Sequence, residues 1–495
     1  MERRLETAAT TDGLARVAIE PVSRVEGHGK VTLLVDEQHH VKQARLHIVE
    51  FRGFEKFVQG RPYWEVPVLV QRLCGICPVS HHLAAAKAID QLVGVKALTP
   101  TAEKVRRLLH LGQILQSHAL HFFYLASPDL LFGFGADVAQ RNVIAVAQAH
   151  PDVARKGILL RKYGQEVIRV VAGKRVHGAC AVPGGVNKSL TAAEREALLA
   201  DIDDIVFWSR EAVALARELF DADAETNARF GSYRAAALSL VRADGGLDLY
   251  HGGLRASDAD GKTIFDHADY GHYWDHIREV VKPWSYMKFP FLRALGPDAG
   301  WYRVGPLARL TNCDFIPTPL AHGERQRFLA YHGGAAAQAT LGYHWARMIE
   351  MLHAAEGIRD LLADPDLLGT ELVAKGERAF RGVGVIEAPR GTLIHHYRID
   401  ENDQIVRANL IVSTTHNNDA MNEAVRRVAE DYLDGHELTE ALLNHIEVAI
   451  RAFDPCLSCA THALGQMPLQ VELVGPGGAL LQRVVRDRGG VRAVP

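Results

Sequence analysis

The sequence predicts an α+β protein, mainly helical, with a core bundle of long helices and smaller peripheral α/β subdomains. Long stretches with apolar residues at helical spacing occupy most of the chain, and short strand-like runs between Gly-rich turns interrupt them. Each end carries a C-x-x-C motif, Cys74 with Cys77 and Cys456 with Cys459, and four thiolates can hold a metal together. We therefore expect a metal site that joins the N- and C-terminal motifs.

Strand and helix patterns alternate around the first motif. Residues 30–35 and 41–49 alternate apolar and polar side chains, which predicts a β-hairpin. Helical turns are expected around residues 55–59 and again before Cys74. A helix is expected over residues 80–95, directly after the motif.

Long helices are expected through the middle of the chain. Thr99-Pro100 supplies a cap and a proline at the first helical position. A capping box from Thr191 to Glu194 opens about thirty further helical residues, which end near Phe220. The other predicted helices cover residues 136–150, 152–172, 324–362, 418–433 and 438–452.

The segment from about residue 231 to 320 has a different pattern. Turns at Asp244-Gly245-Gly246 and Asp260-Gly261 separate short strand-like runs, which predicts a smaller mixed α/β subdomain. Strand patterns return at residues 392–399 and 405–412, on either side of a turn at Asn402. Because the two cysteine pairs lie at opposite ends, we expect residues 1–462 to form a single co-folded unit.

The composition argues against several functional classes. A net charge of −3 gives no sign of a nucleic-acid surface, and no apolar run is long enough to predict a membrane span. Arg3-Arg4 is not followed by an apolar segment, so it is a poor export signal. The two remaining cysteines, Cys180 and Cys313, are interpreted as buried small apolar residues rather than a disulfide scaffold. We therefore expect a cytoplasmic protein.

The residue types at the two motifs leave the metal open. Thiolates bind zinc, nickel and iron–sulfur clusters alike. For two C-x-x-C motifs without further context, zinc or an iron–sulfur centre is the more frequent outcome. A zinc ribbon, however, places its pairs about fifteen to twenty residues apart. Here the pairs lie near opposite ends of the chain.

The residues that flank the cysteines are more specific. Arg72-Leu73-Cys74-Gly75-Ile76-Cys77 with His81, and Asp454-Pro455-Cys456-Leu457-Ser458-Cys459 with His462, resemble the two signatures of the large, catalytic subunit of nickel–iron hydrogenases. The resemblance extends through most of the chain, in the segments Arg24-Val25-Glu26-Gly27-His28, Phe51-Arg52-Gly53-Phe54-Glu55, Pro183-Gly184-Gly185-Val186, Arg303-Val304-Gly305-Pro306-Leu307 and Ala388-Pro389-Arg390-Gly391. Residues 50–60, 284–290 and 456–469 look most like the soluble, bidirectional NAD-reducing branch. The resemblance implies reversible cleavage of H2 to protons and electrons.

The resemblance also assigns roles to the cysteines. It implies that Cys74 and Cys456 are terminal nickel ligands, and that Cys77 and Cys459 bridge nickel to an iron with carbon monoxide and cyanide ligands. Val412, Ser413 and Thr414 match the segment that surrounds one of these diatomic ligands. The family usually has proline and serine where this chain has Ser413 and Thr414, so a hydroxyl is retained at the second position.

Three further residues are expected to act at the centre. Glu26 matches the family's proton-gate glutamate, although a carboxylate beside Arg24 and Lys30 is by itself more typical of a surface ion pair. Heterolysis of H2 needs a base, and the Cys456 sulfur is the nearest candidate. Arg390 matches the arginine that overhangs the open metal position, and His81 is expected to hydrogen-bond a bridging cysteine. His395 and His396 are interpreted as solvated or capped side chains.

A second, hard metal is implied at the C-terminal end. Its expected ligands are Glu55, the carbonyl of Leu410 and His462. Oxygen donors suit magnesium, but histidine is an uncommon magnesium ligand, so magnesium and iron both remain open. The resemblance implies that a maturation protease cuts after His462 once nickel-insertion factors have loaded the site. Residues 463–495, which include strand-like runs at 469–474 and 480–485, would then be a removable extension.

Partners are expected because the chain shows neither an NAD-binding motif nor enough cysteines for an iron–sulfur cluster. No G-x-G-x-x-G follows a predicted strand, so NAD is expected to bind elsewhere. Two remaining cysteines cannot build a four-cysteine cluster. We expect a small subunit with iron–sulfur clusters and a flavin-containing diaphorase module. Alternatives are a sister-branch hydrogenase that reduces NADP, a deazaflavin or a disulfide reductase, and a complex I-like or hydrogen-sensing relative.

Overall fold

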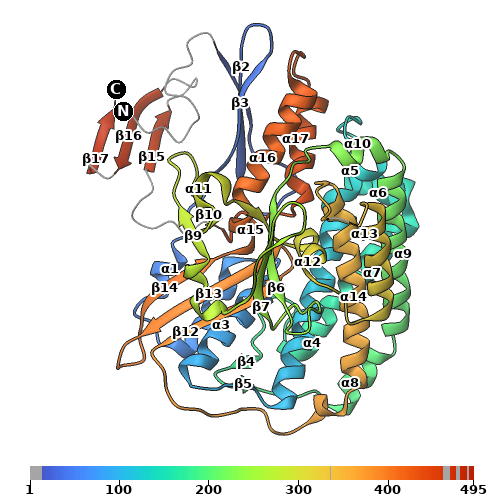
Figure 1. Cartoon of the computed structure of the whole chain (residues 1–495), viewed down its shortest axis with the longest axis vertical. Coiled ribbons are helices and arrows are strands. Elements are labelled where there is room, and N and C mark those ends of the chain that lie inside the picture. Colours follow the sequence, from blue (N-terminus) through green and yellow to red (C-terminus); the bar gives the residue numbers. More distant parts are fainter. Residues whose placement is uncertain (1–13, 335, 461–468, 475–479, 488–489, 495) are drawn as a thin grey trace.

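Long helices lie side by side along one flank of the molecule, and most strands lie on the other (Figure 1). This is a computed structural model, and it describes residues 14–334, 336–460, 469–474, 480–487 and 490–494. In the bundle α4 packs against α7 and α14, and α14 packs against α9 and α13. The bundle helices are α4 Pro100–Leu120, α7 Pro151–Ala172, α9 Ile202–Asp221, α13 Pro319–Tyr331 and α14 Gly342–Ala363. The predicted fold class, α+β with a helical core, is confirmed.

The bundle begins where the sequence predicted. The side-chain oxygen of Thr99 accepts a hydrogen bond from the Ala102 amide at 3.2 Å and caps α4. Helix α4 approaches α7 closely because glycines face each other there. A β-carbon on Gly164 would lie 2.7 Å from the carbonyl oxygen of Gly112. Beyond α4 the helical path continues through η3 His121–Ala126, a π-helical turn, and α5 Ser127–Phe132.

Three predicted helices are shorter or divided. Of residues 136–150, only α6 Val143–Ala149 is helical, because the Asn142 side chain caps it. The stretch after the capping box divides into α8 Ala192–Leu199 and α9. The predicted helix over residues 324–362 is two helices, α13 and α14, because Gly333 and Gly334 both adopt positive φ, at 74° and 75°.

Three of the remaining helices are longer. Two of them border the cysteine motifs in the sequence, and the third packs beside one of these two. Helix α3 Pro78–Leu92 follows the first motif, and α17 Glu440–Ala452 precedes the second, with α16 Asn418–Val428 packed beside α17. The short elements are α1 Phe54–Phe57, η1 Tyr63–Glu65, α2 Val66–Leu69, η2 Val70–Leu73, α10 Ala224–Arg229, η4 Tyr270–Asp275, α11 Gly296–Ala299, α12 Pro306–Asn312, η5 Pro365–Leu368, α15 Ser413–His416 and η6 Ala429–Leu433. Within the described part of the chain, none of the helices combines the length and the apolar composition that a membrane span requires.

Two three-stranded antiparallel sheets position the site. The predicted hairpin is β2 Gly29–Val35 with β3 Val41–Ile48, and β1 Ala15–Ile19 adds a strand that was not predicted. The second sheet has the order β12 Arg381–Ala388, β13 Gly391–Ile399 and β14 Ile405–Ile411. Strand β12 was also missed. Its Gly382 and Gly384 weaken the strand pattern, and both lie directly against the backbone of α3.

Residues 231–320 contain most of the other strands. The sheet order β11-β6-β7-β8 combines β6 Ala236–Val241, β7 Gly253–Ser257, β8 Thr263–Ala268 and β11 Tyr302–Arg303. Two further pairs are β9 Ile277–Val280 with β10 Phe289–Leu292, and β4 Ala181–Val182 with β5 Gly185–Val186. The predicted hairpin near the C-terminus is confirmed and has a third strand, in the order β15 Leu469–Val474, β16 Leu480–Asp487 and β17 Gly490–Val494.

Candidate metal centre

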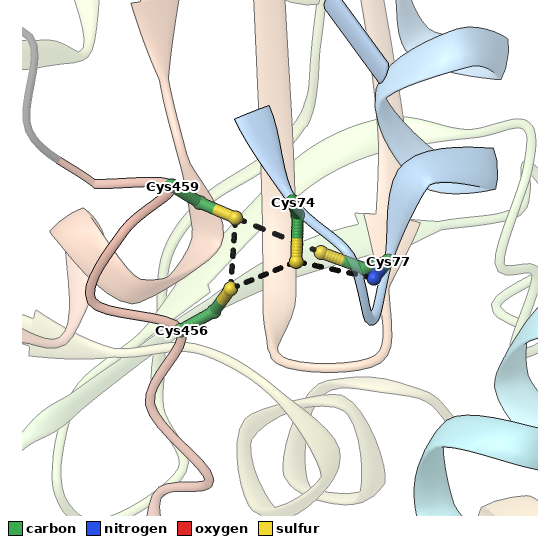
Figure 2. Close-up of side chains that lie close together, drawn as sticks. All are labelled: Cys74, Cys77, Cys456 and Cys459. Atoms are coloured by element: carbon green, nitrogen blue, oxygen red, sulfur yellow. Dashed lines mark hydrogen bonds between the residues drawn. The ribbon is translucent and has the colours of Figure 1, made fainter. Parts of the chain in front are cut away.

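Four cysteine sulfurs from the two ends of the chain meet in the interior (Figure 2). All four side chains are buried, and their sulfur atoms lie within 4.8 Å of one another. The Sγ atoms of Cys74 and Cys456 are 3.1 Å apart, and those of Cys77 and Cys459 are 3.9 Å apart. Among the described residues this is the only group of three or more Cys, His, Asp or Glu side chains placed to share a metal ion. The predicted junction of the N- and C-terminal motifs is confirmed.

Local backbone structure orients both cysteine pairs toward the cluster. The first pair lies in the turn between η2 and α3, where Cys77 is the residue before the helix. The amide nitrogens of Ile76 and Cys77 both donate to the Cys74 sulfur at 3.2 Å. The second pair follows α17, and the chain turns through Asp454, which has a positive φ of 53°. Such a conformation is uncommon for a residue other than glycine and marks a constrained turn.

The Glu26 segment joins the second motif to the N-terminal part of the chain. Glu26 and Cys456 form an isolated parallel β-bridge, in which the Leu457 amide donates to the Glu26 carbonyl at 2.9 Å. The next residue, Gly27, has a φ of +83°, and a β-carbon there would lie 2.6 Å from the Ser458 nitrogen. Only glycine allows the two segments to approach this closely.

The carboxylate of Glu26 points at the cysteine cluster. Its Oε2 lies 2.9 Å from the Cys456 sulfur, which can donate to it as a thiol. The Ser458 amide donates to the same oxygen at 3.2 Å. The structure therefore places Glu26 and Cys456 in direct contact, which the surface ion-pair interpretation of Glu26 does not explain.

An ionic clamp holds the Glu26 segment against α17. Arg24 donates to Asp129 at 2.5 Å and to the Leu125 carbonyl at 2.8 Å. Arg451 of α17 also pairs with Asp129 and donates to the carbonyl of Ser23 at 3.2 Å. Because both arginines share one buried carboxylate, the clamp ties residues near both ends of the chain to α5.

Arg390 lies beside the cluster as a buried cation. Its guanidinium donates to Asp454 at 2.9 Å and to the Ser117 hydroxyl at 3.3 Å. Burial lowers the pKa of Arg390, but the negative charges of Asp454 and of the cysteines outweigh it and hold that pKa well above its usual value. Arg390 is therefore charged at every working pH. Neither Asp454 nor Ser117 was predicted to have a role, although Asp454 lies in the second motif.

A cavity of about 10 Å³ opens beside the cluster, with room for about one water-sized molecule. The hydroxyl of Ser413 donates to the Gly391 carbonyl at 2.7 Å, so it is already engaged. The Thr414 oxygen accepts from the Cys456 amide at 2.9 Å, and its hydrogen remains available to a group in the cavity. The predicted site residues that line this cavity are Cys77, His81, Arg390, Val412, Ser413, Thr414 and Cys456.

His81 extends the site into a chain of hydrogen bonds. Its Nδ1 lies 3.2 Å from Nε2 of His395, and Nδ1 of His395 lies 2.6 Å from the Tyr397 hydroxyl. Nε2 of His81 has no partner among the described protein atoms. The interpretation of His395 as a solvated or capped side chain is wrong. It is fully buried because β13 packs on α3, a contact that no local pattern reveals.

Two of the three residues predicted to hold a second metal lie together. The Leu410 amide donates to Oε1 of Glu55 at 2.8 Å, and Lys288 lies 3.6 Å from the same oxygen. Burial raises the pKa of Glu55 to about 7, although Lys288 opposes this. The third residue, His462, lies outside the described residues.

The donor set fits a thiophilic metal. Hydrogen bonds from Cys456, Cys459 and Cys74 lower the pKa of Cys77 well below its usual value, which favours its thiolate form. Burial raises the pKa values of Cys456 and Cys459 in the absence of a cation. Thiolate sulfurs about 2.3 Å from a divalent metal lie at most about 4.6 Å apart, close to the spread of these four. The residues therefore fit one metal ion or two adjacent ones.

Comparison with known proteins assigns the chain to a family. A family profile described as nickel-dependent hydrogenase matches residues 52–154 and 250–462, and one described as HoxL-like matches residues 16–51. The chain belongs to the nickel-dependent hydrogenases. The predicted relationship to the nickel–iron hydrogenase large subunit is thereby confirmed.

Individual hydrogenases resemble the chain over nearly its whole length. The NAD-reducing hydrogenase HoxS subunit beta of Cupriavidus necator is 50% identical, covering 95% of this chain and 99% of that protein. A crystal structure of an NAD+-reducing nickel–iron hydrogenase in the H2-reduced state has 62% identity and a TM-score of 0.89, covering 90% of this chain and 99% of the other. The nickel–iron–selenium hydrogenase of D. vulgaris Hildenborough, with 24% identity and a TM-score of 0.72, shares the fold.

Proposed function

We propose that this chain is the catalytic subunit of an NAD-reducing nickel–iron hydrogenase, which cleaves H2 reversibly into protons and electrons. The observation that carries the proposal is the buried four-cysteine cluster, with the Glu26 carboxylate in contact with Cys456 and the enclosed charge of Arg390 facing the same cavity. The similarity to NAD-reducing hydrogenases over 90% or more of the chain supports NAD as the final acceptor.

The four cysteines would hold the two metals. In this proposal Cys74 and Cys456 would hold nickel, and Cys77 and Cys459 would be ligands of both nickel and an iron that carries carbon monoxide and cyanide. When bound, this pair supplies an electron-rich, open site at which H2 can be polarised. Thr414 supports the placement of a diatomic ligand, because its hydroxyl hydrogen is free to donate into the cavity.

The residues of the chain would handle the proton. The sulfur of Cys456 can take it up as a base and pass it to Glu26, whose oxygen lies 2.9 Å away. Arg390 faces the same cavity and adds a permanent positive charge, which favours negative charge on the neighbouring thiolates. Asp454 and Ser117 hold the guanidinium in place.

A second metal, magnesium or iron, would bind near Glu55. Support comes from the contact between the Glu55 carboxylate and the backbone of Leu410. We propose that His462 completes this site with the carbonyl of Leu410. Lys288, which lies 3.6 Å from Glu55, would then be one of the groups that hold the unmetallated carboxylate in place.

Metal analysis combined with infrared spectroscopy tests the proposed function. The mature chain is expected to contain one nickel and one iron, with a second iron where iron also fills the site near Glu55, and to show carbonyl and cyanide bands. Cys459→Ser should lose the bands, whereas Cys180→Ser, a matched control at a buried cysteine outside the cluster, should keep them. Zinc in place of nickel, without such bands, would overturn the assignment.

The C-terminal extension is expected to be removed during maturation. We propose that active protein ends at His462, because the freed C-terminus could then settle beside Glu55 and Leu410. Intact-mass measurement checks this directly, with protein produced without nickel as the control that should keep residues 463–495. Active enzyme that retains the extension would contradict the prediction.

The chain is expected to need partners to reduce NAD. Four cysteines are committed to the metals, and Cys180 and Cys313 are too few for an iron–sulfur cluster. We propose that a small subunit with iron–sulfur clusters docks near the first cysteine motif and that a flavin module lies beyond it. Large apolar side chains that are 37–49% exposed support this location, namely Val49, Phe51, Phe57, Trp64 and Val68.

An activity assay checks this requirement. The metallated chain alone should show no NAD reduction with H2, and adding the small subunit and flavin module should restore it. H/D exchange by the chain alone serves as the control for an intact metal site. Sustained NAD reduction by the single subunit would show that the electron route lies within this chain.

A further inference from the structure

Three arginines lie opposite one another on adjacent strands of the β12-β13-β14 sheet. The strand register pairs Arg381 with Arg398, and Arg398 with Arg407. Like charges directly opposite one another across strands destabilise a sheet. None of the three makes an ion pair or side-chain hydrogen bond with another described residue. The row therefore carries positive charge that this part of the chain does not neutralise.

The row of Arg381, Arg398 and Arg407 lines a cavity. A cavity of about 630 Å³ lies between this end of the sheet, β9 and η4. Arg278 of β9 adds a fourth guanidinium to its walls, and Trp274 and Phe380 contribute aromatic surface. The volume lies within the range of about 300–1,000 Å³ that is typical of small-molecule sites.

The inner wall of the cavity offers a polar group without a partner. His396 and Asn409 form the next row of the sheet inward from the arginines. Nε2 of His396 is enclosed and has no hydrogen-bond partner among the described protein atoms. Burial, together with the charges of Arg381, Arg407 and Arg398, lowers the pKa of His396 to about 4, so its ring is neutral at pH 7.

The acidic groups nearby are already engaged. Glu279 also lines the cavity, but it lies 3.5 Å from Lys288. Asp269 near Arg381 pairs with His272 at 2.9 Å. Neither lies within ion-pair distance of the arginine row, so these carboxylates leave its positive charge unpaired.

We propose that this arginine cavity binds an anion with two or more linked phosphate groups, such as the diphosphate of a nucleotide. Guanidinium groups match phosphate oxygens in a bidentate manner, and neighbouring strands repeat them about 4.8 Å apart. A row of guanidinium donors at this spacing suits an extended polyanion better than a single carboxylate. The enclosed His396 nitrogen and the cavity volume of about 630 Å³ favour a small molecule over a segment of another protein.

Calorimetric titration with inorganic pyrophosphate and with ADP tests the proposal on the mature protein in its native assembly. Arg398→Gln removes the central guanidinium, and Arg234→Gln is a matched control at an exposed arginine paired with Asp260. Arg398→Gln should weaken one class of site at least about tenfold, the loss expected for one charge-assisted contact, whereas Arg234→Gln should not. A nucleotide site on a partner subunit would contribute equally to all three proteins.

The two probes also distinguish the source of the phosphate. Tighter binding of ADP would identify a nucleotide site, and equal binding would identify a site for inorganic polyphosphate. Equal affinities of the unsubstituted protein and Arg398→Gln for both probes would overturn the proposal. Loss of a partner subunit from Arg398→Gln without any change in phosphate binding would also overturn it, because the row would then be a docking surface for an acidic protein.

Discussion

Replacing Glu26 with glutamine is expected to lower steady-state H2 turnover by about 10²–10⁴-fold, the range for loss of a positioned proton-transfer group. The amide keeps the size of the side chain and can still accept from the Ser458 amide, but it cannot take a proton from the Cys456 sulfur. H/D exchange with solvent should fall by a similar factor. Electrons should still enter and leave the metal site, which infrared spectra under H2 and after oxidation can follow.

Two further variants make this prediction specific. Glu26→Asp keeps the carboxylate at a shorter reach and should retain part of the activity. Glu50→Gln removes a carboxylate from the same N-terminal region, where it pairs with His28 at 2.7 Å, and should leave turnover unchanged. Full turnover in Glu26→Gln, with normal nickel content, would rule out Glu26 as the proton gate.

Replacing Arg390 with lysine is expected to lower turnover by at least about 10²-fold. Lysine keeps the positive charge, but one ammonium group cannot reach both Asp454 and Ser117 in the geometry of the planar guanidinium. The charge would shift relative to Cys77 and Cys456, and buried Asp454 would lose its hydrogen bond from the guanidinium. Nickel and iron content, measured on the same preparation, separates this effect from failure to assemble the site.

Ser117→Ala is the milder companion to Arg390→Lys. It removes only the 3.3 Å hydrogen bond and leaves the contact with Asp454 intact. A loss of about tenfold is expected, because this long contact lies at the weak end of the range of about 1.5–3 kcal/mol for hydrogen bonds to charged groups. Full turnover in both variants, with normal nickel and iron content, would mean that the exact position of the Arg390 charge does not matter for the reaction.

Much of the secondary structure was predictable because its signals are local. Thr99-Pro100 and the Thr191 capping box start helices where the residue types predict them. The divided helix at Gly333 and Gly334 was missed because an apolar pattern continues through the break. Strand β12 was missed because its glycines weaken the strand pattern in the sequence. In the fold the same glycines allow the strand to lie close to α3.

The candidate site was likewise predictable in part from local sequence and in part only from the fold. The sequence by itself determined the four sulfur donors, the flanking Glu26 and Arg390 segments and the family, because these depend on residue types at short, specific spacings. Only the tertiary structure decided that Glu26 touches Cys456, that Asp454 and Ser117 hold Arg390, and that His395 is buried against His81. These contacts join residues that are tens to hundreds of positions apart. They form when the packing of α3, α17 and the β12-β13-β14 sheet brings separate segments together. A local sequence pattern does not show which of these distant segments will meet.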